Sequence, residues 1–247
     1  GFESGDLKTS IDAVASAVYV DKPDLRRHAA PDGTVTIMFS DIEGSTAMTE
    51  RLGDKRWMEV LREHNAIVRE NVKAHGGFEV KSEGDGFMVA FQSARRALEC
   101  AIDVQRAFAQ RNASFPAHPD PEQSQRVEGP VLSEAEGRAE PAPPAQRASR
   151  RAGREVGAAT EGDIEPIRVR IGLHAGETIR EGEDFFGRNV ILAARIAGQA
   201  GGGEILVSSV LKALVDSAGD LAWGEPRAVE LKGLSGGQEI WPVAWAR

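Results

Sequence analysis

Short apolar runs separated by glycine-containing turns are the first regular feature of the chain after residue 33. Residues 34–39 are apolar and rich in β-branched side chains, which is typical of a buried strand. Residues 78–82 and 87–91 also predict strands, and the intervening Glu-Gly-Asp-Gly predicts a tight hairpin of the Asp-Gly type. We therefore expect one strand and, further along, a pair of antiparallel strands.

Apolar residues at helical spacing predict helices between and after these strands. One helix follows residue 46, and a second, with Asp54 as its N-cap, runs to the glycines at 76 and 77. The remaining predictions are helices over 94–108, 189–197 and 209–215 and strands over 167–173, 204–207, 229–231 and 240–245. Because strands and helices are intermixed and some strands form hairpins, the predicted class is α/β or α+β with a largely antiparallel sheet.

Two segments differ from this pattern. Residues 1–33 contain one mostly apolar stretch and several Pro and Gly residues, and predict a connector that is either a disordered end or a signal-transmitting linker. Residues 113–166 are rich in Pro, Ala, Glu, Arg and Gly, and have too little apolar surface to offset the entropy of ordering. We expect a long flexible insert there. Its arginines could bind an anionic partner, but a solvated loop explains them more simply.

Composition and charge narrow the class of protein. The chain has 247 residues, 41% hydrophobic and 28% charged, as is ordinary for a soluble globular protein. Its apolar runs are far shorter than the roughly 20 residues that span a bilayer, and the start of the chain does not resemble a secretory signal. We therefore expect no membrane segment and a cytoplasmic location. The net charge of -8 argues against a general nucleic-acid-binding protein.

Cysteine content and the first residue add two expectations. Cys100 is the single cysteine, so no internal disulfide and no cysteine-based zinc site can form, and its place on an apolar helix face predicts a core residue. The sequence starts with glycine rather than methionine, which suggests excision from a longer protein with an upstream regulatory domain.

Candidate chemistry begins where the first predicted strand ends. Asp41 follows that strand, and Glu43, Gly44, Ser45 and Thr46 open a helix, so a carboxylate and free backbone N–H groups can together hold a metal and a phosphate chain. A second carboxylate, Asp85, has glycine on either side, where a ligand can approach closely. Taken alone, either aspartate could be a helix cap or a turn residue. Together they could converge on divalent metal ions.

Three blocks of sequence resemble class III adenylyl cyclases, and they occur in the order found in that family. They are Phe-Ser-Asp-Ile-Glu-Gly-Ser-Thr at 39–46, Lys-Ser-Glu-Gly-Asp-Gly-Phe at 81–87 and Arg-Ile-Gly-Leu-His-Ala-Gly-Glu at 170–177. The resemblance runs from residue 34 to the C-terminus, apart from the insert, so residues 34–247 are expected to form one catalytic domain. It implies a ferredoxin-like fold with a central antiparallel sheet flanked by helices, and a dimer with sites at its interface.

The same resemblance implies roles for individual residues. Asp41 and Asp85, with the backbone carbonyl of Ile42, would hold two magnesium or manganese ions that activate the ribose 3′-hydroxyl and bind the triphosphate. Arg195 would stabilise charge on the transferring phosphate, and Lys232 would bind the triphosphate. In the implied homodimer, the aspartates come from one subunit and the two cations from the other.

Lys81 and Asp184 occupy the positions at which the family reads the base. Lysine only donates hydrogen bonds and ionised aspartate only accepts them, which suits N1 and the 6-amino group of adenine. Guanine reverses donor and acceptor at these two edges, so GTP is disfavoured. Both residues would belong to the subunit that supplies Arg195.

One position departs from the family. Where the family usually has an asparagine that orients the ribose, four residues before the arginine, this chain has Ile191. Asn189 is the nearest asparagine, but two residues are about 200° apart on a helix, so it should face elsewhere unless the helix start is irregular. Asn189, Arg188 or water could substitute, and turnover could be slow. His174 is expected to pack in the core rather than to act in catalysis.

The sequence thus predicts an adenylyl cyclase that converts ATP to cyclic AMP with Mg²⁺ or Mn²⁺ in a homodimer. A guanylyl or relaxed-specificity cyclase is one alternative. A non-catalytic nucleotide-binding regulatory module is another, suggested by Ile191. P-loop, zinc-protease and nucleophile-elbow motifs do not occur in the sequence.

Overall fold

The computed structural model describes residues 33–114, 166–181 and 184–246. The predictions of a connector over residues 1–33 and of a flexible insert over residues 113–166 fall almost entirely outside these residues. In the described parts of the chain, no helix combines the length and the apolar content that a membrane crossing requires.

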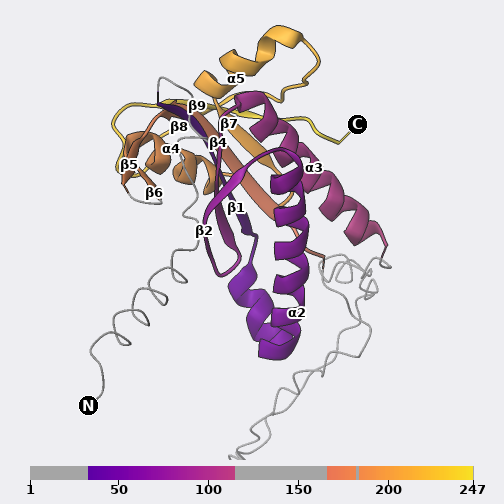
Figure 1. Ribbon diagram of the computed structural model, residues 1–247. Coiled ribbons are helices and arrows are strands. Elements are labelled where there is room, and N and C mark those ends of the chain that lie inside the picture. Colours follow the sequence, from indigo (N-terminus) through magenta and orange to yellow (C-terminus); the bar gives the residue numbers. More distant parts are fainter. Residues whose placement is uncertain (1–32, 115–165, 182–183, 247) are drawn as a thin grey trace, which may run out of the picture. The chain divides into compact units, whose positions relative to one another are not determined.

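A βαββαβ unit forms the first part of the fold (Figure 1). Its elements are β1 (Thr34–Ile42), α2 (Ser45–Ala74), β2 (Phe78–Glu83), β3 (Gly86–Phe91), α3 (Ala94–Ala113) and β4 (Val169–Glu177). Its four strands lie in the order β2-β3-β1-β4, and every neighbouring pair is antiparallel. This is the ferredoxin-like arrangement expected from the resemblance.

Further elements extend the sheet and cover its second face. The sheet continues with β7 (Ile205–Ser208), β9 (Gln238–Pro242) and β8 (Arg227–Val229), and β7 is parallel to β4. The additional helices are α4 (Arg188–Ala197), α5 (Ser209–Val215) and the short 3₁₀ helix η3 (Asp216–Ala218). A separate hairpin consists of β5 (Ile179–Glu181) and β6 (Asp184–Phe186). The predicted mixed α and β class with a mainly antiparallel sheet is confirmed.

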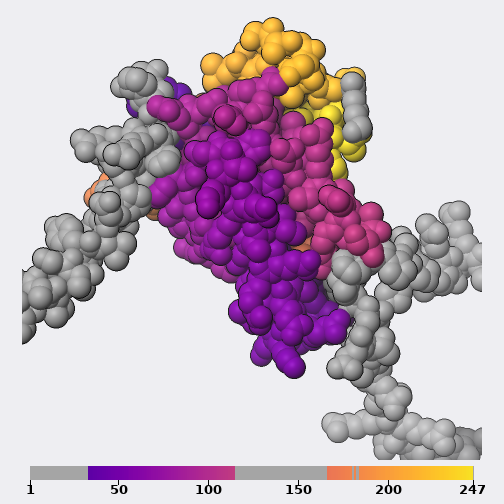
Figure 2. All heavy atoms as spheres, turned by 45° about the vertical axis from the view of Figure 1, so that its right-hand side comes forward, coloured from indigo at the N-terminus to yellow at the C-terminus, as the bar shows by residue number. Residues whose placement is uncertain are grey.

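The two faces of the sheet carry separate apolar clusters. Met38 and Ile42 of β1 pack with residues of α2 and α3. Val35 and Ile37, which alternate with them along the strand, pack with Ala193 of α4 on the opposite face. Figure 2 shows α2 and α3 adjoining on one side of the molecule, with α5 at one end. The sheet therefore lies between α2 and α3 on one face and α4 on the other.

Cys100 and His174 are both buried, as predicted from the sequence. Cys100 is fully buried in α3, and burial raises the pKa of its thiol to about 12. His174 is also buried, and its ring nitrogens contact the Ser208 hydroxyl at 2.7 Å and the Asn189 side-chain oxygen at 3.1 Å. Both residues are part of the packed interior.

Several element boundaries differ from those predicted. The α2 helix is broken at Gly53, whose backbone (φ 73, ψ 163) is non-helical. Gly53, rather than the predicted Asp54, therefore stands at the N-cap position of the second segment. Gly84 and Asp85 form the centre of the β2–β3 turn, which is therefore Gly-Asp rather than Asp-Gly. The last two strands lie two to three residues earlier than predicted, and the β5–β6 hairpin was not predicted.

A reciprocal pair of hydrogen bonds joins the end of α3 to the segment before β4. The Asn112 side-chain amide donates to the Ile167 carbonyl at 2.8 Å, and the Ile167 N–H donates to the Asn112 side-chain oxygen at 3.0 Å. Ile167 is fully buried. Residues 112 and 167 are thus held together although they are 55 positions apart in the sequence.

Candidate functional site

The two predicted metal-binding aspartates lie next to each other. Asp41 is near the end of β1, and Asp85 is in the β2–β3 turn, where its carboxylate accepts a hydrogen bond of 3.0 Å from the Ile42 N–H. Burial raises the pKa of Asp85, and a hydrogen bond with Asp41 and the charge of that residue raise it further. Asp41 thus disfavours the ionisation of Asp85, and two carboxyl groups this close together form a natural position for a cation.

Arg170 is the positive partner of this acidic pair. It lies opposite Asp41 in the β1–β4 register, and its guanidinium donates to one Asp41 carboxylate oxygen through Nε (3.0 Å) and Nη2. About one third of each side chain is exposed (33% for Asp41, 34% for Arg170). The contact is therefore open to exchange with an entering ligand.

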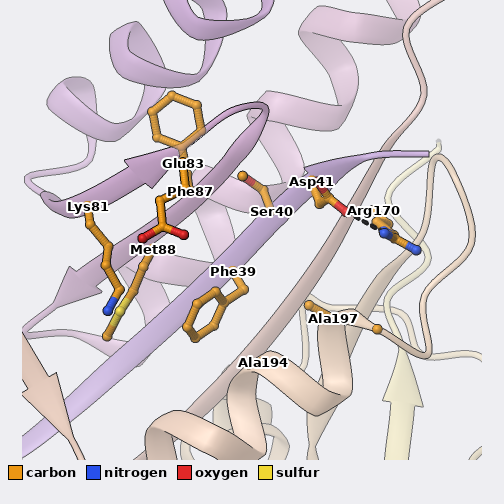
Figure 3. Close-up of a pocket in the computed structure, with 12 residues that line it drawn as sticks. Phe39, Ser40, Asp41, Lys81, Glu83, Phe87, Met88, Arg170, Ala194 and Ala197 are labelled. Carbon is orange, nitrogen blue, oxygen red and sulfur yellow. Dashed lines mark hydrogen bonds and ion pairs between the residues drawn. The ribbon is translucent and has the colours of Figure 1, made fainter. Parts of the chain in front are cut away.

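A cavity of about 330 Å³ lies beside the acidic pair, on the sheet face that carries α4 (Figure 3). Strand register explains its lining, because directly paired residues of antiparallel strands point to the same face. Phe39, Met88 and Lys81 are successive partners across β1, β3 and β2 and form one row. Ala194 and Ala197 of α4 form the opposite wall. The cavity has an apolar floor with charged groups around it, as is usual for small-molecule sites.

The predicted base-reading pair is formed within one chain. The Lys81 ammonium group donates to an Asp184 carboxylate oxygen at 2.7 Å, although the two residues are 103 positions apart. The other Asp184 oxygen accepts the Phe185 N–H at 2.7 Å, which fixes the orientation of the carboxylate. The Lys81 side chain is 44% exposed and that of Asp184 27%, so both can contact a ligand.

The helix start predicted to bind phosphate is only partly available. Glu43 N–H donates to the Arg168 carbonyl at 2.9 Å, and the Glu43 carboxylate accepts the Gly202 N–H at 2.9 Å. Gly44 adopts a left-handed conformation and precedes Ser45, the first residue of α2. The hydrogen bond between Glu43 and Gly202 ties this turn to the glycines after α4. Gly44, Ser45 and Thr46, at the start of α2, are the predicted phosphate-binding residues that remain available.

The outer face of α4 carries Arg195 and Ile191. They are four residues apart and therefore lie on one side of the helix, where both are exposed and Ile191 is 48% accessible. Asn189 points to the sheet instead, donating to the Glu177 carbonyl at 2.7 Å and contacting His174. The structure thus does not bring Asn189 to the face that carries Arg195.

Lys232 lies in the loop after β8, near α4. The preceding residue, Leu231, is buried in a cluster with Leu192 and Ile196 of α4. Lys232 itself is exposed. This packing brings the second predicted cation to the element that carries Arg195, but neither cation lines the cavity beside Asp41.

Two charged residues of the cavity were not assigned a role from the sequence, Arg170 and Glu83. The alternation of apolar residues with arginine in β4 was a signal for Arg170, because such a strand has one polar face. Glu83 lies two residues after Lys81, so in a strand the two share a face. In Figure 3 the Glu83 carboxylate points into the cavity.

Comparison with known proteins identifies the family. The family model described as the adenylate and guanylate cyclase catalytic domain matches residues 28–243. An adenylate cyclase from Mycosarcoma maydis is 32% identical over 198 residues, which cover 76% of this chain. The chain spans 7% of the length of that curated relative.

Solved structures share the fold. An adenylate cyclase from Trypanosoma brucei, analysed in its monomeric state, has a TM-score of 0.61 at 24% identity over 87% of this chain and 91% of that one. The guanylyl cyclase Cya2 has a TM-score of 0.59 at 22% identity over 85% of this chain and 91% of that one. The family model, the shared fold and the matching blocks agree, and the chain belongs to the adenylate and guanylate cyclase catalytic domain family.

Proposed function

We propose that the domain is an adenylyl cyclase, which converts ATP to 3′,5′-cyclic AMP and pyrophosphate in a homodimer. The observation that carries the proposal is the 2.7 Å contact between Lys81 and Asp184. It presents a hydrogen-bond donor and an acceptor side by side at an exposed edge of the domain. Adenine offers the complementary acceptor, N1, next to the complementary donor, its 6-amino group. The adenylate cyclase from Mycosarcoma maydis supports the same substrate.

The residues around Asp41 suit magnesium or manganese. In the described residues, no three His, Cys, Asp or Glu side chains form a group that could hold a metal ion. Mg²⁺ is commonly bound by one or two carboxylates, with water and substrate phosphates completing its coordination. Asp41, Asp85 and the Ile42 carbonyl would provide such an incomplete oxygen-donor set. The raised pKa of Asp85 supports this assignment, because a cation would relieve the repulsion between the two carboxylates.

The reaction joins the ribose 3′-oxygen to the α-phosphorus and breaks the bond from that phosphorus to the pyrophosphate. Metal ions at Asp41 and Asp85 would activate the 3′-hydroxyl and neutralise charge on the phosphates. Arg170 lies beside them as a further positive group for the phosphate chain. Arg195 would stabilise charge that develops at the α-phosphate, and Lys232 would hold the triphosphate.

A second copy of the chain completes the site in this proposal. Arg195 and Lys232 are exposed, and neither lines the cavity that contains Asp41. Within one chain, the proposed metal ligands therefore lack the two cations that the chemistry requires. A two-fold dimer would supply them twice, because each copy then donates its cations to the site of the other.

The direct test is to incubate the purified chain with ATP or GTP and Mn²⁺ or Mg²⁺ and to identify cyclic products by chromatography. We expect cyclic AMP as the main product and its loss in the Asp85→Ala variant. Cyclic GMP as the main product would favour a guanylyl cyclase instead. Nucleotide binding without any cyclic product would favour a regulatory module. The exposed Ile191 also permits that function, because it puts an apolar side chain where the family has its ribose-orienting asparagine.

A further inference from the structure

Besides Lys81, the cavity contains a second charged group at the end proposed to read the base, Glu83. Glu83 and Lys81 are two residues apart on β2, so their Cα atoms are about 7 Å apart and their side chains share a face of the sheet. Both line the cavity, and Phe39 and Met88 form the apolar surface next to them. A planar base lying on that surface would meet both charged side chains at its edge.

The Glu83 carboxylate is available to a ligand. Among residues 33–114, 166–181 and 184–246, no donor is hydrogen-bonded to it, and the residue is exposed. Glu79, on the same strand, differs because Arg69 binds its carboxylate with hydrogen bonds of 2.8 Å. Glu83 therefore has unused acceptor capacity inside the cavity.

A metal-binding role does not suit Glu83. Asp41 and Asp85 are the neighbouring acidic residues, but no group of three such side chains that could hold a metal occurs in the described part of the chain. A triphosphate would be repelled by an additional carboxylate. The base, which carries N–H donors, is the part of a nucleotide that this group can bind favourably.

The three charged side chains offer two overlapping hydrogen-bonding patterns. Asp184 binds Lys81, and Glu83 is the next group along β2, so the order is acceptor, donor, acceptor. Adenine uses the first two through its 6-amino group and N1. Guanine presents an acceptor, O6, followed by two donors, N1–H and the 2-amino group, which fit Lys81 and the two oxygens of Glu83.

We propose that Glu83 is a specificity-determining residue that allows the base site to read guanine, so that GTP is a second substrate beside ATP. This inference rests on the proposed cyclase function. With adenine bound, Glu83 would face the C2–H group and remain hydrated, which the exposed position permits. With guanine bound, the carboxylate would accept two N–H groups that otherwise lack a partner. Guanine recognition thus depends on Glu83, whereas adenine recognition depends on Asp184.

The test compares kcat/KM for ATP and GTP in the wild-type chain and in Glu83→Gln and Glu83→Ala. Glutamine keeps the shape of the side chain but replaces one acceptor by a donor, which would oppose the guanine donors. We expect the GTP-to-ATP ratio to fall about ten-fold or more in both variants. Glu70→Gln, which removes the same charge from the exposed surface of α2, should leave the ratio unchanged. An unchanged ratio in the Glu83 variants, or an equal loss with both nucleotides, would overturn the inference.

A binding measurement separates this inference from the proposed activity. The nucleotides 3′-deoxy-ATP and 3′-deoxy-GTP lack the attacking hydroxyl and cannot be cyclised, so their dissociation constants can be measured by calorimetry with Mn²⁺ present. Glu83→Gln should weaken 3′-deoxy-GTP about ten-fold relative to 3′-deoxy-ATP. If cyclic AMP forms but this selective loss is absent, only the role of Glu83 is wrong. If neither analogue binds, the cyclase proposal fails and the inference fails with it.

Discussion

Asp85 shows most clearly how a residue proposed to bind a metal can weaken the fold. Its carboxylate is brought into the fold beside a second carboxylate, and both burial and Asp41 raise its pKa. A group whose pKa is higher in the folded chain than in the unfolded chain binds its proton more tightly when folded. Its ionisation at neutral pH therefore weakens the fold, which is the usual cost of a preformed cation site.

Replacing Asp85 by Asn should therefore raise the thermal midpoint at pH 7.5 in the presence of EDTA. The asparagine oxygen can still accept the Ile42 N–H, while the charge is removed. We expect a gain of at most about 1 kcal/mol, because the site is half exposed and screened by solvent. The gain should vanish below the unfolded pKa of about 3.9, grow as the pH rises towards the folded pKa, and then level off.

Thermal unfolding followed by circular dichroism measures this effect. Adding Mn²⁺ provides the matched comparison, because it should stabilise the wild-type chain more than Asp85→Asn. A lower midpoint for the variant throughout this pH range would show that Asp85 stabilises the metal-free fold.

Arg195 should matter for catalysis rather than for folding. Its side chain is exposed on α4, and no hydrogen bond or ion pair of that side chain occurs within the described residues. We expect Arg195→Ala to lower kcat by about 10²-fold to 10³-fold with a smaller change in KM, as for the loss of a group that acts mainly in the transition state. Steady-state kinetics with ATP tests this. Arg96→Ala, an exposed arginine of α3, is the control, and equal loss in both variants would contradict the assignment.

The break in α2 is the clearest feature at the level of single elements. Gly53 has φ 73 and ψ 163, a conformation that is strained for any residue with a Cβ atom. A Cβ there would meet no atom within 4 Å, so the cost of a side chain comes from the backbone alone. The helix can therefore change direction at this one position.

Gly53→Ala should lower the free energy of unfolding by about 1–3 kcal/mol. Chemical denaturation measures the change. Gly237→Ala is the matched control, because Gly237 is also surrounded by open space but has no positive φ. Equal stability of the two variants would mean that the α2 break can relax into a continuous helix.

Much of the element pattern could be predicted from local sequence. The β-branched residues of β1, for example, predicted a buried strand, and β1 is buried in the sheet. The apolar residues of α3 recur at helical spacing and form its buried face. The β5–β6 hairpin could not be predicted in this way, because each strand has only three residues. The sequence predicted the start of the second helical segment at Asp54, one residue after the observed break at Gly53, because glycine and aspartate can both stand at a helix N-cap.

The candidate site was predictable only in part. Periodicity cannot show that Lys81 meets Asp184 across 103 positions, and the family resemblance was needed to connect them. Nor does the local sequence show that Asn189 turns to the Glu177 carbonyl, because that contact depends on how α4 packs on β4. Arg170 was missed because its importance arises from strand register, which places it opposite Asp41.

At the scale of the whole molecule, the proposed dimer makes a quantitative prediction. As homodimers, Asp85→Ala should be inactive and Arg195→Ala should keep about 1% of wild-type activity or less. In a heterodimer, one site would lack both residues and the other would be intact. Random pairing of equal amounts makes half of the dimers mixed, so about a quarter of wild-type activity should return.

The mixture is prepared by co-refolding or by long incubation of the two variants, followed by an assay for cyclic AMP. Dilution of the wild-type chain gives a second measurement, because activity per chain should fall below the dissociation constant of the dimer. If mixing restores nothing while both variants remain dimeric, each site belongs to one chain.

The hydrogen bonds between Asn112 and Ile167 bear on the long segment between them. They hold residues 112 and 167 together within the unit formed by residues 1–112 and 166–247. We therefore expect that deleting residues 115–163 and joining the ends leaves folding and dimerisation intact. Circular dichroism and size-exclusion chromatography test this, and loss of the dimer would show that the deleted residues are structural.

The same two hydrogen bonds make this position a natural place to divide the gene. A fragment ending at residue 114 would carry Asp41, Lys81 and Asp85, and a fragment starting at residue 166 would carry Asp184, Arg195 and Lys232. The long antiparallel pairing of β1 with β4 would hold the fragments together. Under the proposed function neither fragment would cyclise ATP alone, so fusing each to one of two interacting proteins would turn their association into a second-messenger signal.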